Sequence, residues 1–397
     1  MSKKLSREYS NLLFRRHWEL SPKALRLLGQ CEAYIKAINN TPILPPLYRD
    51  LMNVALMKGA QATTAIEGNT LSDEEIRKIM DNKRLPPSKE YQGIEVKNIL
   101  NAFNELLSEL LSGNEVRYVS RELLLRFHKM VGQNLGDHFA AVPGQLRVSD
   151  VVVGRYRCPD YRDVPVLLDM LCEWLRQEFR YGQSAQPFSE VVVQAIVTHV
   201  YIEWIHPFGD GNGRTGRLVE FYILLRGGNP DIASHILSNH YNLTRTEYYR
   251  QIEIATEKRS LTEFIEYALL GFRDGLTQTL QVIQKSQFLN TWHKLIYDRF
   301  DSIRDSSRSS TYKRQRSLAL ELPFDKEFQV VKVSHLSIRL AQLYANVSEK
   351  TVQRDIEKLV ALELVRKSEN GYITNTNVLR SMVAKRRHVP NKDDYLD

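Results

Sequence analysis

One short segment of this 397-residue chain concentrates the residue types that phosphoryl chemistry needs. The segment Ile205–Arg217 has the sequence IHPFGDGNGRTGR. An apolar helical run ends just before it, and a second helical run, Leu218–Leu225, follows it. Gly211, Gly213 and the main chain between them can bring several N–H groups together at the N-terminus of the following helix. Unpaired N–H groups and the helix dipole make such a turn a cradle for an anion.

The side chains of this segment complete a set suited to nucleotide chemistry. Arg214 and Arg217 lie three residues apart and project from nearly one helix face, where two planar guanidinium groups suit neighbouring phosphates. Asp210 offers a hard oxygen ligand for Mg²⁺, which usually takes only one or two protein carboxylates. His206 is the one side chain of the segment that accepts a proton near neutral pH. The segment contains no Ser or Cys nucleophile, which favours direct transfer over a covalent enzyme intermediate.

The sequence HPFGDGNGRTGR resembles the motif of the Fic family, H-P-F-x-[DE]-G-N-G-R-x-x-R, at every fixed position. The resemblance covers roughly residues 50–275, with the catalytic core between about 115 and 270. It implies a mainly α Fic helical fold with a β-hairpin flap. It also implies a protein AMPylator that transfers AMP from ATP to a Tyr, Thr or Ser hydroxyl of a target protein and releases pyrophosphate.

The resemblance assigns a role to each residue of the loop. His206 deprotonates the target hydroxyl, Phe208 anchors the loop, and Asp210 holds Mg²⁺ against the phosphates. ATP is bound by a set of loop residues, of which Asn212 can also reach phosphate or ribose: Gly211, Asn212, Gly213, Arg214, Thr215, Gly216 and Arg217. Downstream, Tyr248 and Tyr249 resemble the adenosine-side tyrosines of the family, and Thr256 stands where some relatives carry Asn. Tyrosines at helical spacing are also common core residues.

A hairpin is expected inside the otherwise helical domain. Two β-prone runs, Leu146–Val148 and Val151–Val153, flank Ser149-Asp150. Spacing alone suggests a surface ornament, whereas the resemblance implies a flap that aligns the target segment by main-chain pairing. The predicted flap residues are Leu146, Val148, Val151, Val152 and Val153.

A second motif lies upstream, at the end of a helix expected over roughly Leu51–Ile66. The stretch from Thr63 through Glu67 to Gly68 resembles the inhibitory motif [ST]-x-x-x-E-[GN] of autoinhibited Fic proteins. A Glu at a helix C-terminus is unfavourable beside the helix dipole, so it needs a cationic partner. The resemblance makes that partner Arg217, which Glu67 would keep from the γ-phosphate. The alternative is a solvated surface glutamate.

The last seventy residues have a different pattern. A short helical stripe ends near Asn346, a second helix begins at Ser348, and β-prone pieces surround Asn370-Gly371, a strong hairpin signal. This order predicts a small C-terminal winged helix-turn-helix domain. The second helix carries both basic and acidic residues outside its apolar stripe, so DNA binding and protein docking or dimerisation both stay open: Lys350, Gln353, Arg354 and Lys358, with Glu349, Asp355 and Glu357.

The domains expected are N-terminal helices with the inhibitory helix (1–115), a Fic catalytic domain (116–290), a basic, Ser-rich linker (291–325), and the winged helix with a basic tail, Lys385–His388 (326–397). The net charge of +8 suits a polyanionic partner. No apolar run reaches the length of a membrane span, and the N-terminus lacks the apolar core of a signal peptide. The three cysteines, Cys31, Cys158 and Cys172, have no redox or metal spacing, which indicates the cytoplasm.

Other functions fit the same residues. The chain could transfer a moiety other than AMP, or remove AMP through the inhibitory glutamate acting on water. It could also be a nucleotide-sensing transcriptional regulator whose winged helix binds DNA. The expected partners are a target protein, the chain itself through self-modification, DNA, and a second copy in a homodimer, with no membrane.

Overall fold

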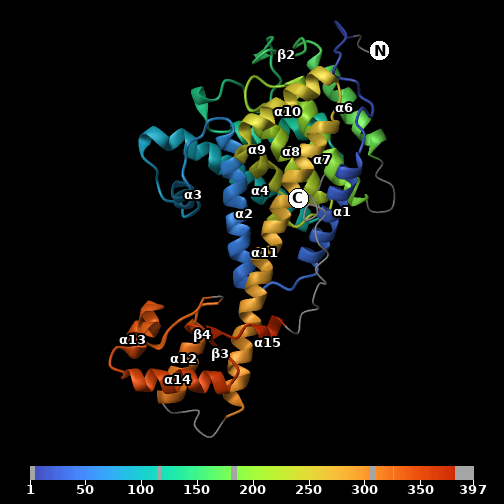
Figure 1. Cartoon of the computed structure of the whole chain (residues 1–397). Coiled ribbons are helices and arrows are strands. Elements are labelled where there is room, and N and C mark those ends of the chain that lie inside the picture. Colours follow the sequence, from blue (N-terminus) through green and yellow to red (C-terminus); the bar gives the residue numbers. More distant parts are fainter. Residues whose placement is uncertain (1–4, 114–117, 180–185, 304–309, 325, 381–397) are drawn as a thin grey trace. The chain divides into compact units, whose positions relative to one another are not determined.

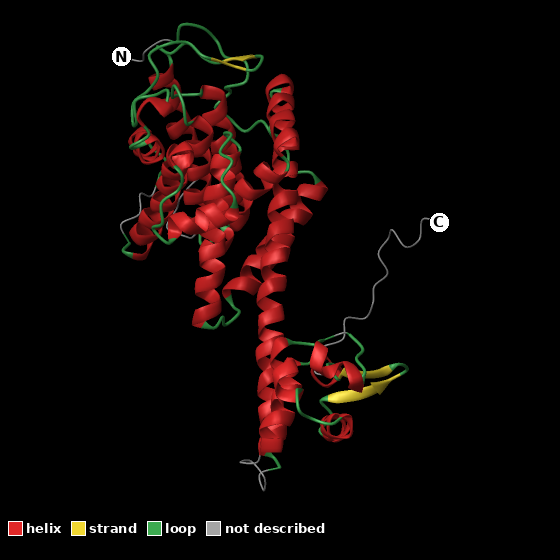
Figure 2. Cartoon of the chain, turned by 90° about the vertical axis from the view of Figure 1, so that its left-hand side faces the viewer, coloured by secondary structure: helices red, strands yellow, loops and turns green. Residues whose placement is uncertain are grey.

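The computed structural model describes residues 5–113, 118–179, 186–303, 310–324 and 326–380. These residues are mostly helical, with two short two-stranded sheets (Figures 1 and 2). The prediction of a mainly α fold is confirmed. The chain divides into two compact units, Met1–Ile283 and Gln284–Asp397.

The first unit holds helices α1 to α10 and the beginning of α11, whose remainder belongs to the second unit. The bounds are α1 (Pro22–Asn39), α2 (Pro45–Ala65), α3 (Asp73–Met80), α4 (Glu90–Leu111), α5 (Arg121–Gly132), α6 (Val164–Glu178), α7 (Phe188–Ile205), α8 (Asn212–Arg226), α9 (Ile236–Leu243), α10 (Arg245–Lys258) and α11 (Thr262–Asp301). Three single 3₁₀ turns connect them: η1 (Pro87–Lys89), η2 (Gly136–His138) and η3 (Asp231–Ala233).

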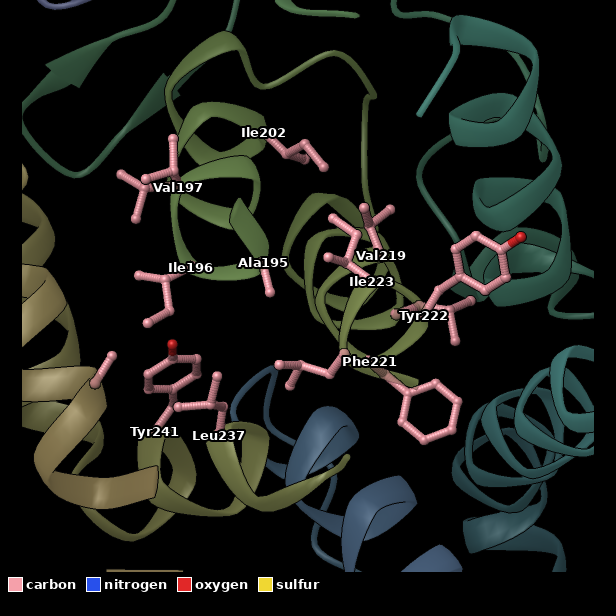
Figure 3. Close-up of a cluster of buried hydrophobic side chains, with 14 of the residues drawn as sticks. Ala195, Ile196, Val197, Ile202, Val219, Phe221, Tyr222, Ile223, Leu237 and Tyr241 are labelled. Carbon is pink, nitrogen blue, oxygen red and sulfur yellow. The ribbon is translucent and has the colours of Figure 1, made fainter. Parts of the chain in front are cut away.

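Helices α7 and α8 form the centre of this unit. They pack closely on each other, and α7 is mostly apolar and buried along its length, which is typical of a helix surrounded by protein. By length and composition alone α7 could also cross a membrane, but 78% of it is buried inside the unit, as in a core helix. Figure 3 shows Ile196 of α7, Ile223 of α8 and Tyr241 of α9 in this core.

Helix α2 leads toward the predicted inhibitory motif. It begins earlier than expected, because Pro45 occupies a first-turn position where its missing N–H is not needed. It ends at Ala65, and Gly68 then turns the chain with a positive φ of 100°. The capping box of Ser72 and Glu75 opens α3. The turn after α2 is therefore defined by Gly68 at its start and by the capping box of α3 at its end.

The hairpin differs from the prediction. Its strands are β1 (Val152–Val153) and β2 (Tyr156–Arg157), joined through Gly154, whose φ is 56°. Leu146–Val148 is not a strand. The reason is Arg147, whose side chain points into the protein and whose main-chain N–H donates to Pro207 O at 3.0 Å. The turn therefore forms at Gly154-Arg155, five residues later than the predicted Ser149-Asp150.

The second unit contains two helices followed by a hairpin, as predicted. The bounds are α12 (Ser310–Glu321), η5 (Val330–His335), α13 (Ile338–Tyr344), α14 (Glu349–Ala361), β3 (Val365–Ser368), β4 (Gly371–Thr374) and α15 (Asn377–Arg380). Strands β3 and β4 are antiparallel, and Phe328 adds a bridge to Tyr372. The identification of this unit as a winged helix stays a prediction.

The predicted linker over 291–325 is wrong for the residues that the structure describes. Helix α11 continues to Asp301, and α12 occupies most of the second part. Three apolar residues of this segment recur every fourth position and pack into the core of the second unit: Trp292, Ile296 and Phe300. The Ser- and Arg-rich composition of the segment makes this spacing hard to recognise in the sequence. The predicted basic tail, Lys385–His388, lies outside the described residues.

Candidate active site

Residues 212–217 of the segment Ile205–Arg217 are the first residues of α8, which begins earlier than predicted, and the preceding residues form a turn between α7 and α8. The turn begins at His206, which has a left-handed backbone (φ 48°, ψ 60°), and ends at Gly211 (φ 77°), which directly precedes α8. Phe208 is buried and stacks on His128 of α5, with ring centroids 3.8 Å apart. The His128 ring accepts from Gly144 N–H at 3.0 Å and donates to Asp210 O at 2.9 Å. His128, which the sequence did not single out, therefore holds the loop from behind.

The side-chain amide of Asn212 lies inside the loop, and its predicted contact with phosphate or ribose stays a prediction. The amide donates to Phe208 O (3.0 Å) and accepts from Phe208 N–H (2.9 Å), so both polar atoms brace the turn. The Asn212 side chain is buried in this structure.

His206 is arranged to accept a proton. Its Nδ1 lies 3.3 Å from the carbonyl oxygen of Glu203. A carbonyl can only accept, so Nδ1 carries the hydrogen and Nε2 keeps its lone pair. Burial lowers the pKa of His206 below its ordinary value, although the nearby Glu203 opposes this shift. The ring is therefore neutral near pH 7 and can act as a base.

Arg214 is held between two carboxylates. Its Nη1 lies 2.5 Å from Glu95 Oε1 and its Nη2 lies 2.8 Å from Asp210 Oδ1. Glu95 belongs to α4, 119 positions upstream of its partner, and lies in no motif that would indicate this contact. The other oxygen of Glu95 accepts from Asn69 Nδ2 at 3.0 Å. The turn after α2 is thereby connected to the first arginine of the loop.

Arg217 makes the predicted contact with Glu67. The Arg217 side chain is 1% exposed, and its Nη2 donates to Glu67 Oε1 at 2.5 Å and to Thr63 O at 3.0 Å. Burial opposes ionisation of Glu67, but the charge and hydrogen bond of Arg217 outweigh it and hold the pKa of Glu67 below its usual value. Both groups are therefore charged near pH 7. Thr63 takes part through its carbonyl, and Gly68 supplies the turn.

The Glu67 carboxylate lies over the first turn of α8. A Cβ added to Gly213 would overlap Glu67 Oε1 and would come within 2.8 Å of Arg217 Nη1. Glycine at this position therefore leaves room for an anionic oxygen against the helix N-terminus. In this structure Glu67 supplies that oxygen.

Two residues of the loop face the core rather than the anion side. Thr215 is completely buried, and a Cβ on Gly216 would meet His199 and Ile202 of α7 at 3.7 Å. Their predicted contact with ATP is not supported by this placement, because both lie on the side of α8 that packs on α7. Gly211, Gly213, Arg214 and Arg217 make up the anion side.

The two predicted tyrosines are placed differently. Tyr248 is 1% exposed and its hydroxyl contacts His199 (2.9 Å) and Glu203 (3.5 Å), so it is a core residue behind the loop. Tyr249 is 47% exposed and donates to Ile66 O at 3.3 Å, directly beside Glu67. Thr256 accepts from Trp204 Nε1 at 2.8 Å and is occupied in supporting α7. Of these three side chains, that of Tyr249 is the exposed one.

The flap residues are mostly turned outward. Val148, Val152 and Val153 are exposed, Val151 is half-buried, and Leu146 packs partly against the core. An exposed apolar hairpin tip is consistent with a surface that another chain covers.

Asp210 fits a magnesium ligand. Its side chain is about one-third exposed, at 31%, and Oδ2 accepts a single hydrogen bond, from Ala140 N–H at 3.2 Å. Among the described residues there is no group of three or more His, Cys, Asp or Glu that could hold a metal. A lone carboxylate suits Mg²⁺, because phosphates and water complete its shell.

The fold is the mainly helical Fic fold, and the loop between α7 and α8 carries the Fic motif. A model described as the Fic/DOC family matches residues 118–224, so this part of the chain is similar to a Fic domain. Two similar relatives are the protein adenylyltransferases fic-1 of Caenorhabditis briggsae and Caenorhabditis elegans. Each is 30% identical over 207 residues, which is 52% of this chain and 37% of the relative. The chain thus spans well under half the length of these relatives.

Two solved structures have the same fold. A Fic family protein from Desulfovibrio desulfuricans G20 superposes with a TM-score of 0.54 at 20% identity, covering 89% of this chain and 94% of that one. Residues 134–508 of Fic-1 from C. elegans give a TM-score of 0.54 at 24% identity, covering 66% and 73%. At these identities the likeness establishes the fold.

Proposed function

We propose that this chain is a protein adenylyltransferase that transfers AMP from ATP to a Tyr, Thr or Ser hydroxyl of a target protein. The observation that carries the proposal is the juxtaposition of His206, with a free Nε2, and the N-terminus of α8, flanked by Arg214 and Arg217. The names of the C. briggsae and C. elegans relatives support the same activity.

The reaction follows from the placement of these groups. His206 Nε2 takes the proton of the target hydroxyl, and the hydroxyl oxygen attacks the α-phosphorus. The bond from that phosphorus to the bridging oxygen of the β-phosphate breaks, and pyrophosphate leaves. The N–H groups of Gly211–Gly213 bind the developing negative charge, and Arg214 and Arg217 hold the β- and γ-phosphates. Asp210 would hold Mg²⁺, which neutralises phosphate charge when it is bound.

We propose further that the state described here is autoinhibited. Glu67 occupies Arg217 and fills the space beside Gly213, so ATP binding there leaves the γ-phosphate without its partner. ATP can still enter in a pose unsuited to attack. The Asn69–Glu95 hydrogen bond supports the same turn from α4.

Labelled ATP tests the reaction class. Incubation with α-³²P-ATP should label protein, whereas γ-³²P-ATP should not, because the γ-phosphate departs with pyrophosphate. Label from γ-³²P-ATP alone would identify a kinase and overturn the proposal. UTP, GTP and CTP labelled at the α-phosphate test transfer of another nucleotide. Loss of label from pre-modified protein, dependent on Glu67, would reveal AMP removal.

We expect a proline at Val152 to reduce target modification at unchanged ATP affinity. Cys158 N–H donates to Val151 O at 3.3 Å, and bonded and non-bonded pairs alternate along an antiparallel ladder. The Val152–Arg157 pair is therefore non-hydrogen-bonded, and the Val152 N–H points away from the partner strand. Proline would remove this outward donor without breaking a bond inside the hairpin. Labelling of proteins in a cell lysate measures the effect, and calorimetry gives the ATP affinity.

Val152→Ala is the matched control, because it shortens the side chain and keeps the N–H. It should label the lysate more strongly than Val152→Pro. Equal losses of ATP affinity and transfer in the proline variant would mark the hairpin as a structural element and remove it from target recognition.

A second function, DNA binding, is favoured by one observation in the second unit. Asp355 of α14 is 1% exposed and accepts from Arg314 Nε (2.7 Å), Gln315 (2.8 Å) and Tyr344 (3.1 Å). Its negative charge is therefore turned inward, and Arg354 remains exposed. The outer face of α14 is more basic than the sequence suggested.

We expect Arg354→Ala to weaken binding of the full chain to DNA, and raised salt to weaken it further, because phosphate contacts release counterions. Gel-shift titrations with genomic fragments at two salt concentrations measure both effects. Glu357→Gln is the control, since it removes a negative charge from the same helix and should not weaken binding. If no fragment binds at low salt, docking or dimerisation is the better account.

We place the protein in the cytoplasm as part of this proposal. Cys31, Cys158 and Cys172 are buried free thiols, and burial raises the pKa of Cys158 to about 11. Unpaired structural cysteines are typical of a reducing compartment.

A further inference from the structure

Arg147 lies between the flap and the catalytic loop. Its side chain is 1% exposed, and it donates to three main-chain carbonyls: Nε to His206 at 2.8 Å, Nη1 to Ser149 at 2.8 Å and Nη2 to Pro159 at 2.5 Å. The Arg147 N–H donates to Pro207 O at 3.0 Å. One buried side chain thus joins both ends of the flap to the residue expected to act as the base.

This arrangement is unusual for a residue with a purely stabilising role. A buried cation is costly unless its donors are satisfied, and ion pairs inside a protein are weak stabilisers. Among the described residues Arg147 forms one ion pair, in which its Nη1 lies 3.9 Å from Asp150 Oδ1. The Asp150 carboxylate is half exposed. Burial lowers the pKa of Arg147. The hydrogen bonds to the three carbonyls therefore offset most of the cost of burying the Arg147 charge. Each of these bonds holds a different stretch of backbone.

The stretch that matters most is His206. A left-handed backbone is unfavourable for a residue other than glycine, and surrounding contacts must hold it. The His206 N–H is held by Ile202 O at 2.9 Å, and its carbonyl is held by Arg147. The ring is then oriented through Nδ1 on Glu203 O. Without Arg147 the peptide that follows His206 loses its side-chain anchor.

We propose that Arg147 is a positioning residue that fixes His206 in its reactive orientation and couples it to the flap. The inference rests on the proposed base role of His206 and extends it. A target segment that pairs with β1 contacts the stretch between Ser149 and Pro159. Arg147 donates hydrogen bonds to the carbonyls at both ends of this stretch. Binding of the target is thereby coupled to the orientation of the His206 ring.

The electrostatic surroundings of His206 give a second signature. Burial is the largest influence on the pKa of His206 and lowers it. Three charged groups also act on this pKa: Glu203 of α7 and Glu67 after α2 raise it, and Arg147 lowers it. A base works in its neutral form, so the rate falls as pH drops through its pKa. Removal of the Arg147 charge should therefore move the acid limb of the pH–rate profile to higher pH.

Arg147→Gln and Arg147→Lys separate geometry from charge. Both are made in the Glu67→Gly background, where transfer is expected to be measurable. Arg147→Gln should lower kcat at least ten-fold, leave the calorimetric Kd for ATP within about two-fold, and shift the acid limb upward. Arg147→Lys keeps the charge but cannot reach three carbonyls, so kcat should fall while the acid limb stays in place. Arg26→Gln is the control: the same charge change on the exposed face of α1 should alter neither.

Unchanged kcat and an unchanged acid limb in Arg147→Gln would overturn the proposal. Parallel losses of kcat, ATP affinity and melting temperature in both variants would reduce Arg147 to a structural residue. If Arg147→Gln does not fold, Arg147→Lys decides through its kcat at unchanged ATP affinity. Titration of the His206 imidazole by NMR, without ATP, reports the upward pKa shift even if the parent transfers no AMP. Failure of the proposed function is thereby distinguished from failure of this inference.

Discussion

Glu67→Gly is expected to raise AMP transfer by an order of magnitude or more. In the proposed mechanism the Glu67 carboxylate competes with the γ-phosphate for Arg217, which it contacts in the structure beside the first turn of α8. Its removal frees the guanidinium and removes repulsion against the triphosphate. Coupling between two states of a switch is typically about 1–3 kcal/mol, or roughly 5–150-fold. Self-modification with α-labelled ATP is the measurement, since it requires no knowledge of the target.

Two further variants show whether the gain comes from the released arginine. Arg217→Ala in the Glu67→Gly background should lose it, because the partner for the γ-phosphate is gone. Glu67→Gln keeps the shape and removes the charge, and it should recover part of the gain. Glu74→Gln makes the same change on an exposed side chain of α3 and should change nothing. Equal labelling by wild type and Glu67→Gly would refute autoinhibition and leave the catalytic loop untouched.

His206→Ala is expected to lower transfer by about 10²–10⁴-fold, the usual contribution of a general base. ATP binding should largely survive, because the anion side of the site is made by α8. The left-handed backbone at position 206 disfavours Ala, so His206→Asn is the better-folded variant: Asn tolerates this conformation and cannot take the proton. Labelled transfer and calorimetric ATP binding, measured on both variants in the Glu67→Gly background, separate chemistry from affinity.

The pH dependence of the parent gives an independent check. Because burial lowers the pKa of His206, its neutral form persists below the ordinary histidine value of about 6.5. The acid limb of kcat should therefore lie below that pH and disappear in His206→Asn. Near-normal transfer by either variant would remove His206 from the mechanism.

The parts of the site that could be predicted are those contained in a short stretch of sequence. The loop from His206 to Arg217 brings its glycines and arginines together by local geometry alone, so its position between two helices was predictable. The contact between Glu67 and Arg217 spans 150 positions, and only the family resemblance pointed to it. Asn212 and Tyr248 show the limit of that resemblance, because a motif position does not reveal which way a side chain turns.

The residues that sequence reasoning missed share a physical cause. Glu95 and Arg147 make their decisive contacts with partners 119 and 59 positions away, and neither lies in a distinctive motif. Nothing in a single sequence separates such a Glu on a helix from a solvated one. The hairpin differs from the prediction because both β-prone runs, Leu146–Val148 and Val151–Val153, favour strand, and the inward turn of Arg147 excludes the first. The composition of the 291–325 segment indicates a linker, whereas the four-residue spacing of Trp292, Ile296 and Phe300 indicates a helix, and the structure has a helix.

The position of Glu67 along the chain has a consequence for the timing of activity. Synthesis proceeds from the N-terminus, so Glu67 is added to the growing chain 150 residues before Arg217. Domains tend to fold in that same order. The finished catalytic loop therefore never exists in a chain that lacks Glu67, and the first folded molecules can already be restrained. A newly made enzyme of this design would have to be switched on, rather than switched off, before it modifies the proteins around it.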